Sequence, residues 1–180
     1  MNRSRYSKNV SGFTLTEMIM VMIIIGILAG IAIPSFFTWM PNYQLRRAAR
    51  DLYSSMQRSK MEAIKGNQPV VFSFSPAPGN TYQATLSGIT VVMLPVNLTD
   101  YGYGIQFGSG SATVSADPPQ ALPGNGVPGT YTSTTFDTRG NVNNLGYVYI
   151  TNSRRSVYAV GTPMMGGVIR IRKWAAPSWD

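Results

Sequence analysis

Gly12-Phe13-Thr14-Leu15-Thr16-Glu17 leads directly into an apolar stretch, residues 18–37, and this part of the chain decides its architecture. No charged side chain occurs from residue 18 to residue 45, and residues 18–37 alone supply twenty positions. An α-helix rises about 1.5 Å per residue, so twenty residues cross a hydrocarbon layer of about 30 Å. The sequence therefore predicts a membrane-spanning helix near the N-terminus.

A basic leader precedes this helix and contains Arg3, Arg5 and Lys8. In an ordinary secretory peptide the cleavage site follows the apolar region, which is then discarded. Here the Gly12-Phe13 junction precedes the apolar region, so cleavage after Gly12 would leave the helix in the mature chain. The leader favours an N-terminus on the cytoplasmic side, although three arginines also follow the span closely.

Glu17 has two interpretations. Thr14-x-x-Glu17 has the spacing of a capping box, in which both side chains satisfy N–H groups at a helix start. A carboxylate beside an apolar span costs about 2–3 kcal/mol, however, and such residues usually mark function and a charged partner. The residues alone leave both roles open.

The N-terminal motif resembles the class III signal peptide of type IV pilins and of the pseudopilins of type II secretion. The resemblance implies cleavage by prepilin peptidase after Gly12 and N-methylation of the new terminus, Phe13. It also implies that Glu17 neutralises the amino group of Phe13 in a neighbouring subunit. Pro34 matches a proline that pilins have near that position, where local melting lets the helix stretch in a filament. Thr16 departs from the aliphatic residue that is usual in the family.

Two prolines and two aromatic residues mark the end of the apolar stretch. Pro34 and Pro41 are expected to bend or locally melt the helix, because each removes one backbone hydrogen bond. Trp39 and Tyr43 are expected to be anchors at the membrane–water interface rather than ligand contacts.

Beyond Tyr43 the pattern becomes amphipathic. Apolar side chains recur at helical spacing, while arginines, lysines and acids fill the other face. The apolar positions are Leu45, Ala48, Ala49, Leu52, Met56, Ala63 and Ile64. Gly66-Asn67 is a typical helix C-cap, so residues 14–65 are predicted to form a nearly continuous helix.

The rest of the chain predicts β structure. Short β-prone runs, separated by Gly, Pro and Asn, occur at residues 70–74, 82–86, 90–94, 104–107, 132–136, 147–150, 157–160 and 168–173. Residues 108–129 lack periodicity and are expected to form a long exposed loop. The predicted fold class is α+β, with a long N-terminal helix packed on a C-terminal antiparallel β-sheet or sandwich.

The predicted organisation has four parts. Residues 1–12 form the leader, 13–40 a transmembrane or filament-core helix, 41–66 an amphipathic scaffold helix, and 67–180 a β-rich globular domain. Two later motifs resemble the FimT/GspH type of minor pilins and pseudopilins. They are residues 57–70, which resemble the helix exit where the family has an Arg-x-x-Ala-Ile element before the first strand, and Phe136-Asp137-Thr138-Arg139-Gly140, which resembles its Phe-x-x-x-Gly turn.

The last predicted strand suggests a DNA contact. In several pilins of this type linked to DNA uptake, a C-terminal Gly-Arg-x-Arg element binds DNA, and here Arg170-Ile171-Arg172-Lys173-Trp174 resembles it with the glycine displaced by two residues. Strand alternation places Arg170, Arg172 and Trp174 on one face, where arginine forks suit phosphates and an indole can stack on a base.

Two further arginines bear on this hypothesis. Arg154 and Arg155, in the predicted turn before residue 157, would widen the patch. A net charge of +8 agrees with a polyanionic partner but also with anionic lipids or envelope polymers. The alternative is that alternating Arg and Ile protect an exposed edge strand from aggregation.

Enzymatic chemistry has little support. The chain has no His and no Cys, which removes the usual general base, thiol nucleophiles, most transition-metal sites and any disulfide. Asp137, Asn141 and Asn143 suggest a calcium loop, but the glycine and distal Glu of an EF-hand are missing, so a plain turn is favoured. No cofactor, metal site or catalytic residue is predicted.

These observations predict a minor pilin or pseudopilin, a processed, membrane-anchored subunit of a type IV pilus-like filament in a structural, priming or tip position. Expected partners are prepilin peptidase, other pilins or pseudopilins, and the assembly platform of the inner membrane. The expected location is the bacterial inner membrane, with one span and a periplasmic C-terminal domain, and then the pilus or pseudopilus. The alternatives are a DNA-binding pilin for DNA uptake, a type II secretion pseudopilin acting in protein export, and a permanently anchored bitopic protein.

Overall fold

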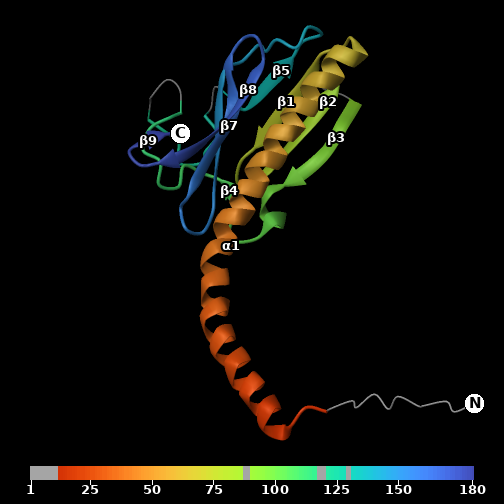
Figure 1. Ribbon diagram of the computed structural model, residues 1–180. Helices are drawn as coiled ribbons and strands as arrows, with labels where there is room; N and C mark the ends of the chain where they lie inside the picture. The colour runs from red at the N-terminus through yellow and green to blue at the C-terminus, as the bar shows by residue number, and fades with distance from the viewer. Residues whose placement is uncertain (1–11, 87–89, 117–120, 129–130) are drawn as a thin grey trace, which may run out of the picture. The chain divides into compact units, whose positions relative to one another are not determined.

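One long helix and nine short strands make up the described chain, residues 12–86, 90–116, 121–128 and 131–180 of a computed structural model (Figure 1). Helix α1 runs from Leu15 to Gly66. The strands are β1 Val70–Ser75, β2 Thr81–Leu86, β3 Thr90–Asn97, β4 Gln106–Phe107, β5 Ser133–Phe136, β6 Gly146–Thr151, β7 Val157–Met164, β8 Val168–Ala175 and β9 Ser178–Trp179, with a 3₁₀ turn, η1, at Leu98–Tyr101. The chain divides into two compact units, Met1–Trp39 and Met40–Asp180.

In the first unit the helix exposes its apolar side chains. From Phe13 to Trp39 the large apolar residues are between 44% and 77% exposed. This part of α1 is long and apolar enough to cross a membrane, and none of it is buried by the described chain. The backbone stays helical at Pro34 and at Pro41, so the predicted local melting is absent from this structure.

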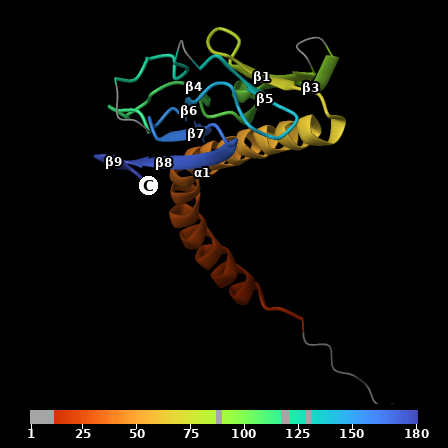
Figure 2. The same cartoon turned by 90° about the horizontal axis from the view of Figure 1, so that it is seen from above.

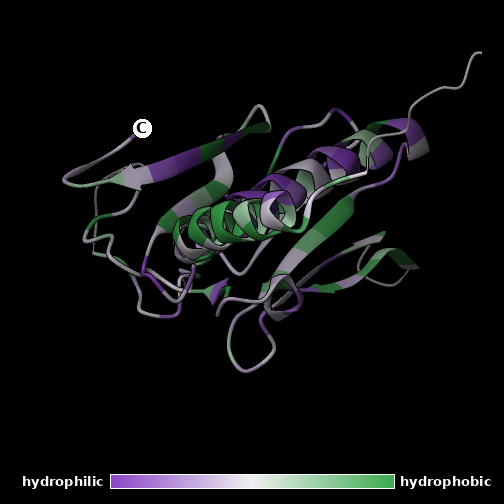
Figure 3. Ribbon diagram, turned by 60° about the horizontal axis from the view of Figure 1, so that its bottom comes forward, coloured by the Kyte–Doolittle hydropathy of each residue, from purple (hydrophilic) through white to green (hydrophobic). Residues whose placement is uncertain are grey.

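In the second unit α1 becomes amphipathic. Figure 3 shows the change from apolar turns to turns that mix polar and apolar residues. One face is buried and consists of Pro41, Leu45, Ala48, Ala49, Leu52, Met56, Ser59 and Ala63. These positions recur every three or four residues, which is the spacing of a single helix face. Ile64, predicted to lie on this face, is instead 40% exposed, because the buried face continues from Ser59 to Ala63 and Ile64 is rotated away from it by one residue.

The helix ends through Asn67 rather than through Gly66. Asn67 has a φ of 47°, in the left-handed region, whereas Gly66 belongs to the helix. The N–H of Gln68 donates to the carbonyl of Ala63 over 3.3 Å. A left-handed residue followed by this long-range bond is a Schellman-type cap, in which Asn is the usual substitute for glycine.

The strands form two antiparallel sheets. One has the order β3-β2-β1-β5 and the other the order β4-β6-β7-β8-β9. In Figures 1 and 2 the later half of α1 lies against both sheets. The helix therefore provides one wall of a core that the two sheets complete, and the predicted α+β class is confirmed.

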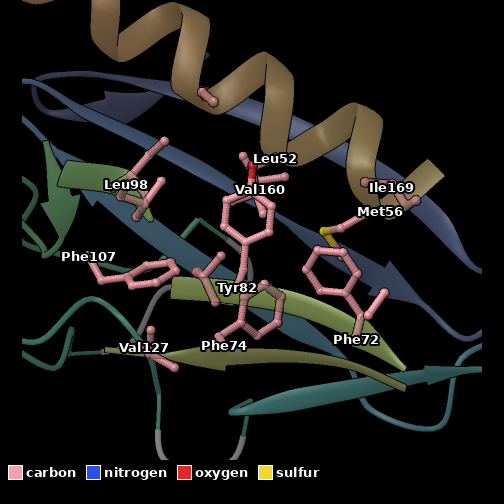
Figure 4. Close-up of a cluster of buried hydrophobic side chains, with 14 of the residues drawn as sticks. Leu52, Met56, Phe72, Phe74, Tyr82, Leu98, Phe107, Val127, Val160 and Ile169 are labelled. Atoms are coloured by element: carbon pink, nitrogen blue, oxygen red, sulfur yellow. The ribbon is translucent and has the colours of Figure 1, made fainter. Parts of the chain in front are cut away.

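The core joins all three layers. Figure 4 shows Leu52 and Met56 pointing from α1 toward Phe72 and Tyr82 of the first sheet, with Val160 of the second sheet beside them. The rings of Phe72 and Tyr82 stack with 5.8 Å between centroids and 19° between planes. All five side chains are buried, so each excludes water from the others. This burial is the main stabilising contribution to the domain.

All eight predicted β segments contain strands. The structure extends six of them by one to four residues, shortens 132–136 by one residue to β5, and shortens 104–107 to the two residues of β4. β9 and η1 were not predicted. Ser178 and Trp179 are too few to show a period, and they pair with Trp174 and Ala175 through a tight reversal of the chain.

The prediction that residues 108–129 form an exposed loop was wrong for its described residues. Ala112, Ala116 and Val127 are buried, and an isolated bridge joins Val114 to Ala121. The N–H of Ala116 donates to the hydroxyl of Tyr149 over 3.0 Å. The loop has no hydrophobic periodicity, but its small side chains pack against the aromatic residues of the second sheet. Such packing leaves no periodic pattern in the sequence, so the burial of the loop could not be predicted from periodicity.

Candidate functional site

Thr14 caps the start of the membrane helix. Its carbonyl accepts a hydrogen bond from the N–H of Met18, and its Oγ1 accepts from the N–H of Glu17, both over 3.2 Å. These are the two bonds of an N-cap residue. The hydroxyl of Thr16 lies 3.1 Å from Thr14 Oγ1. Cleavage after Gly12 would therefore leave one exposed residue, Phe13, before the cap.

The Glu17 carboxylate is exposed at the first turn of α1. Half of the predicted capping box is formed, because Thr14 accepts from Glu17. Within the described residues the carboxylate itself has no hydrogen bond or ion pair, so the other half is not formed. A negative charge here is favoured by the positive end of the helix dipole. The side chain is available for a cationic partner.

Strand β8 presents its cations as predicted but not its tryptophan. Ile169 belongs to the main core, whereas Trp174 lies in a second buried cluster on the other face. Arg170 and Arg172 share the face of Trp174 by alternation and are half-buried. β9 pairs only with Trp174 and Ala175, so residues 168–173 form an edge among the described strands.

The prediction that Trp174 stands free to stack on a base is wrong. Its side chain is 8% exposed and packs edge-on against Trp179, with 5.1 Å between ring centroids. The indole N–H of Trp179 donates to the carbonyl of Val114 over 2.9 Å. The unpredicted β9 and the packed loop together cover Trp174.

Arg154 and Arg155 lie in the β6–β7 turn, as predicted, and both are exposed. Arg155 has a φ of 61°, and its Nη2 donates to the carbonyl of Gly110 over 3.0 Å. The side chain of Asn152 organises the turn by accepting from the N–H groups of Arg154 and Ser156, each over 3.1 Å. Arg155 therefore has a structural role in holding the loop, whereas Arg154 has no such contact among the described residues.

The helix brings two further cations to β8. A hollow of about 430 Å³, which we call the basic pocket, is lined by Arg46, Arg50, Tyr158, Ile171, Arg172, Lys173 and Asp180. Figure 2 shows β8 running alongside α1 at this place, and Figure 3 shows the polar stretch of β8. Burial raises the pKa of the Tyr158 hydroxyl, and the positive charges of Arg46 and Arg50 oppose that rise.

The Asp137 turn is satisfied internally. Asp137 Oδ1 accepts from the N–H groups of Arg139 and Asn141, each over 2.8 Å, and Oδ2 accepts from the Asn141 amide. Desolvation acts to raise the pKa of Asp137, but these hydrogen bonds and the charge of Arg139 outweigh it and lower the pKa. This is the plain turn that the sequence favoured. No group of three or more metal-ligating side chains occurs among the described residues.

Sequence reasoning missed the contribution of Arg46 and Arg50 to the basic pocket. Both were assigned to a solvated helix face, and both are exposed. Their spacing of four residues indicated a shared face. Their proximity to Arg172 and Lys173 depends on how the helix crosses the sheet, and no local pattern encodes that crossing.

A capped apolar helix followed by a domain of two antiparallel sheets, with one carboxylate near the helix start, defines the class of membrane-anchored pilins and pseudopilins. Residues 7–33 match the prokaryotic N-terminal methylation motif. Residues 48–163 match the family described as type II transport protein GspH, and the chain belongs to that family. It is a type IV pilin or pseudopilin of the GspH/FimT type, a class of structural proteins whose members assemble with other pilins after processing by prepilin peptidase.

Two solved structures are similar to this chain. Both are crystal structures of the type IV minor pilin FimU of Pseudomonas aeruginosa strain PAO1. One is 14% identical, with a TM-score of 0.46 over 71% of this chain and 91% of that chain. The other crystal form is 13% identical, with a TM-score of 0.49 over 77% and 94%. None of the curated proteins matches this chain.

Proposed function

We propose that prepilin peptidase cuts this chain after Gly12, that Phe13 becomes N-methylated, and that the chain then leaves the inner membrane for a type IV pilus-like filament as a minor structural or tip subunit. The observation that carries the proposal is the exposure, between 44% and 77%, of the large apolar side chains from Phe13 to Trp39. Such a surface is stable only when lipid or apolar helices cover it. The membrane and then the filament core provide these two covers.

Glu17 provides the specificity of assembly in this proposal. Moving its carboxylate into an apolar helix bundle costs about 2.5–3.5 kcal/mol unless a positive charge accompanies it. The new α-amino group of Phe13 in a neighbouring copy is such a charge, since its pKa of about 8 keeps it mostly protonated at neutral pH. Glu17 is exposed and lies four residues after Phe13, so it can face the terminus of a copy displaced along the filament axis.

Pro34 is the proposed point of helix extension. A proline at position 34 cannot donate to the carbonyl of Gly30, so the helix lacks one backbone bond there. Gly30 adds flexibility, because glycine is a weak helix former. The helix is continuous at this place in the structure, and we infer that it melts only when neighbouring subunits pack against it.

Assembly of the full-length chain tests the role of Glu17. Glu17→Gln is expected to be cleaved normally but to enter sheared filaments at least tenfold less than the wild type. The variant loses the charge pairing with Phe13, and a loss of about 1.4 kcal/mol in the free energy of assembly corresponds to a tenfold lower incorporation. Thr16→Val is the matched control, since it changes the neighbouring residue without changing charge. Mass spectrometry of the N-terminus reports cleavage and methylation. Equal incorporation of Glu17→Gln and wild type would exclude the proposed pairing.

The proposed cellular setting follows from the same helix. A single span with the leader in the cytoplasm would place the domain of residues 40–180 in the periplasm, beside an inner-membrane assembly platform. The same subunit design serves a pilus and a type II secretion pseudopilus, in which the domain would contact exported proteins or other tip subunits. We infer no catalytic role, since His and Cys are absent from the sequence.

DNA capture is a second candidate function. The supporting observation is that Arg170 and Arg172 share one face of an edge strand, with Lys173 next to them and Arg154 exposed in the β6–β7 turn. Trp174 is excluded as a stacking platform by its burial. Arginine forks on an exposed edge can contact backbone phosphates without it.

Fluorescence anisotropy across a salt series tests this candidate, with a short duplex and the domain of residues 40–180. DNA capture predicts a log–log salt slope of about −2 to −4 that shrinks by about one to two units in Arg170→Ala/Arg172→Ala. Arg58→Ala/Lys65→Ala removes the same charge from an exposed helix face and serves as the control. An identical slope in all three proteins assigns Arg170 and Arg172 to protection of the edge strand.

A further inference from the structure

The basic pocket has more cations than carboxylates in its lining. Four cations line it, and Asp180 is its one carboxylate. The single ion pair among the described residues, Arg47 Nε to Asp51 Oδ2 over 3.9 Å, lies elsewhere. Arg47 of that pair also lines a second hollow of about 430 Å³, to which Asp100 contributes a carboxylate and Gln44 an amide. The second hollow has one cation and one carboxylate in its lining, whereas the basic pocket has four cations and one carboxylate.

The cations of the pocket come from two separate elements. Arg46 and Arg50 are one helical turn apart on α1, and Arg172 and Lys173 come from β8. Tyr158 of β7 and Ile171 complete its lining with a phenol and an apolar side chain. The volume of the pocket lies in the range of small-ligand sites, roughly 300–1,000 Å³. The guanidinium groups of Arg46 and Arg50, one helical turn apart, suit a phosphate, because each can donate two parallel hydrogen bonds.

The pocket also lies close to the membrane span along the chain. Tyr43, 47% exposed, precedes Arg46 by three residues and Arg50 by seven, so all three share one face of α1. Tyrosine is enriched at the level of lipid headgroups. Arg46 follows Tyr43 by about 4.5 Å of helix rise, and helical side chains lean toward the N-terminus. The guanidinium group of Arg46 therefore reaches back toward the level of Tyr43.

We propose that the basic pocket binds the phosphate headgroup of an anionic phospholipid in the membrane that residues 18–37 cross. The headgroup phosphate lies between the guanidinium groups of α1 and the ammonium group of Lys173, which shares the face of Ile171 by strand alternation, and Ile171 contacts the adjoining glycerol or acyl carbons. The bound lipid neutralises the pocket and holds the domain against the membrane before assembly. This inference goes beyond the proposed function and requires membrane anchoring but no filament.

Energy transfer in lipid nanodiscs tests the proposal on the full-length chain. The sequence has no cysteine, so Ser178→Cys places a single donor dye on the exposed β9, near the pocket residue Asp180. Acceptor dyes are attached to lipid headgroups. Discs of phosphatidylcholine alone are compared with discs in which phosphatidylglycerol replaces part of it. We expect energy transfer to rise with phosphatidylglycerol and to fall as salt is added.

Arg46→Gln/Arg50→Gln is the pocket variant, and Arg58→Gln/Lys65→Gln is a control of equal charge on exposed positions of the same helix. Each cation beside an anionic membrane surface raises the equilibrium constant for docking about fivefold. The pocket variant lacks two such cations, so its docking constant should be about thirty-fold lower, whereas that of the control should not change. Thermal unfolding of each variant verifies that the domain is folded. Filament assembly is not scored, so failure of this test is distinct from failure of the proposed function.

Three results would overturn the proposal. The first is energy transfer that does not depend on phosphatidylglycerol. The second is an equal loss of docking in the pocket variant and in the control, which would assign the effect to net charge. The third is binding of a short DNA duplex that depends on Arg46 and Arg50 while the lipid has no effect, which would assign the pocket to nucleic acid.

Discussion

Thr162→Val is expected to destabilise the domain by about 1–3 kcal/mol, because it removes the acceptor that lies 2.7 Å from the buried hydroxyl of Tyr131. Tyr131 and Thr162 are both fully buried, and their hydroxyl oxygens lie 2.7 Å apart. Thr162 Oγ1 donates its one hydrogen to the carbonyl of Asn144 over 3.2 Å. The Tyr131 hydroxyl must therefore donate to Thr162. Valine keeps the shape of threonine and removes that acceptor.

Tyr131→Phe and the double variant complete a double-mutant cycle that separates this hydrogen bond from packing. Tyr131→Phe should cost about 0.5–1.5 kcal/mol, since Thr162 keeps its bond to Asn144. The double variant no longer has an unpaired tyrosine hydroxyl, so its cost should be at least about 0.5 kcal/mol smaller than the sum of the single costs. The Asn144 carbonyl stays satisfied in both valine variants, because Thr134 Oγ1 also donates to it over 3.2 Å.

Urea denaturation of residues 40–180 measures these free energies of unfolding through the fluorescence of Trp174 and Trp179. This fragment contains every buried residue of α1. Thr132→Val, at an exposed threonine beside Tyr131, is the control and should change stability by less than about 0.5 kcal/mol. Additivity of the two single variants within about 0.3 kcal/mol would refute the assigned bond.

Three further predictions concern the same domain. Burial raises the pKa of Tyr131 to about 12. The folded state therefore keeps the tyrosine proton to a higher pH than the unfolded chain does. The contribution of the neutral Tyr131 to the free energy of unfolding is complete below pH 10.0 and is lost as the pH rises toward about 12. Melting temperatures over this range should fall less steeply for Tyr131→Phe, and an unchanged slope would contradict the assignment. Asn67→Ala should cost about 1–2 kcal/mol, because alanine is strained at a φ of 47°, whereas Asn67→Gly should cost nothing measurable in urea. Lys60 Nζ donates to the carbonyl of Gly167 over 2.9 Å, so Lys60→Met should cost about 1.5–3 kcal/mol in the same assay, and Lys65→Met, at an exposed lysine, should be neutral.

The architecture could be predicted because its signals are local. A run of residues without charge sets the apolar part of α1, and the recurrence of Leu45, Leu52 and Met56 at helical spacing sets its buried face. Strand centres follow from alternating side chains bounded by turn residues. The strand ends do not follow in this way, because Val157–Met164 continues past Gly161 through pairing with β6 at Thr162 and with β8 at Met164.

The functional surfaces could be predicted only in part. The motif around Glu17 is contiguous, so the sequence displays it completely. The accessibility of Trp174 depends on contacts with Trp179 and with residues of the 108–129 loop, which share no period with β8. The basic pocket depends on the crossing of α1 and β8, which is a property of tertiary packing.

The continuity of α1 has a mechanical consequence. The same helix, Leu15–Gly66, carries the exposed apolar turns of the first unit and the buried face of the second. A pull along the axis of the part of α1 that lies in the second unit loads the contacts of Leu45, Leu52 and Met56 in shear, all at once, instead of separating them in turn. Lys60 adds a tether to the β7–β8 hairpin near the far end of the helix. A force along the axis of these later turns is therefore resisted by the whole interface together, while a sideways force would meet one contact at a time.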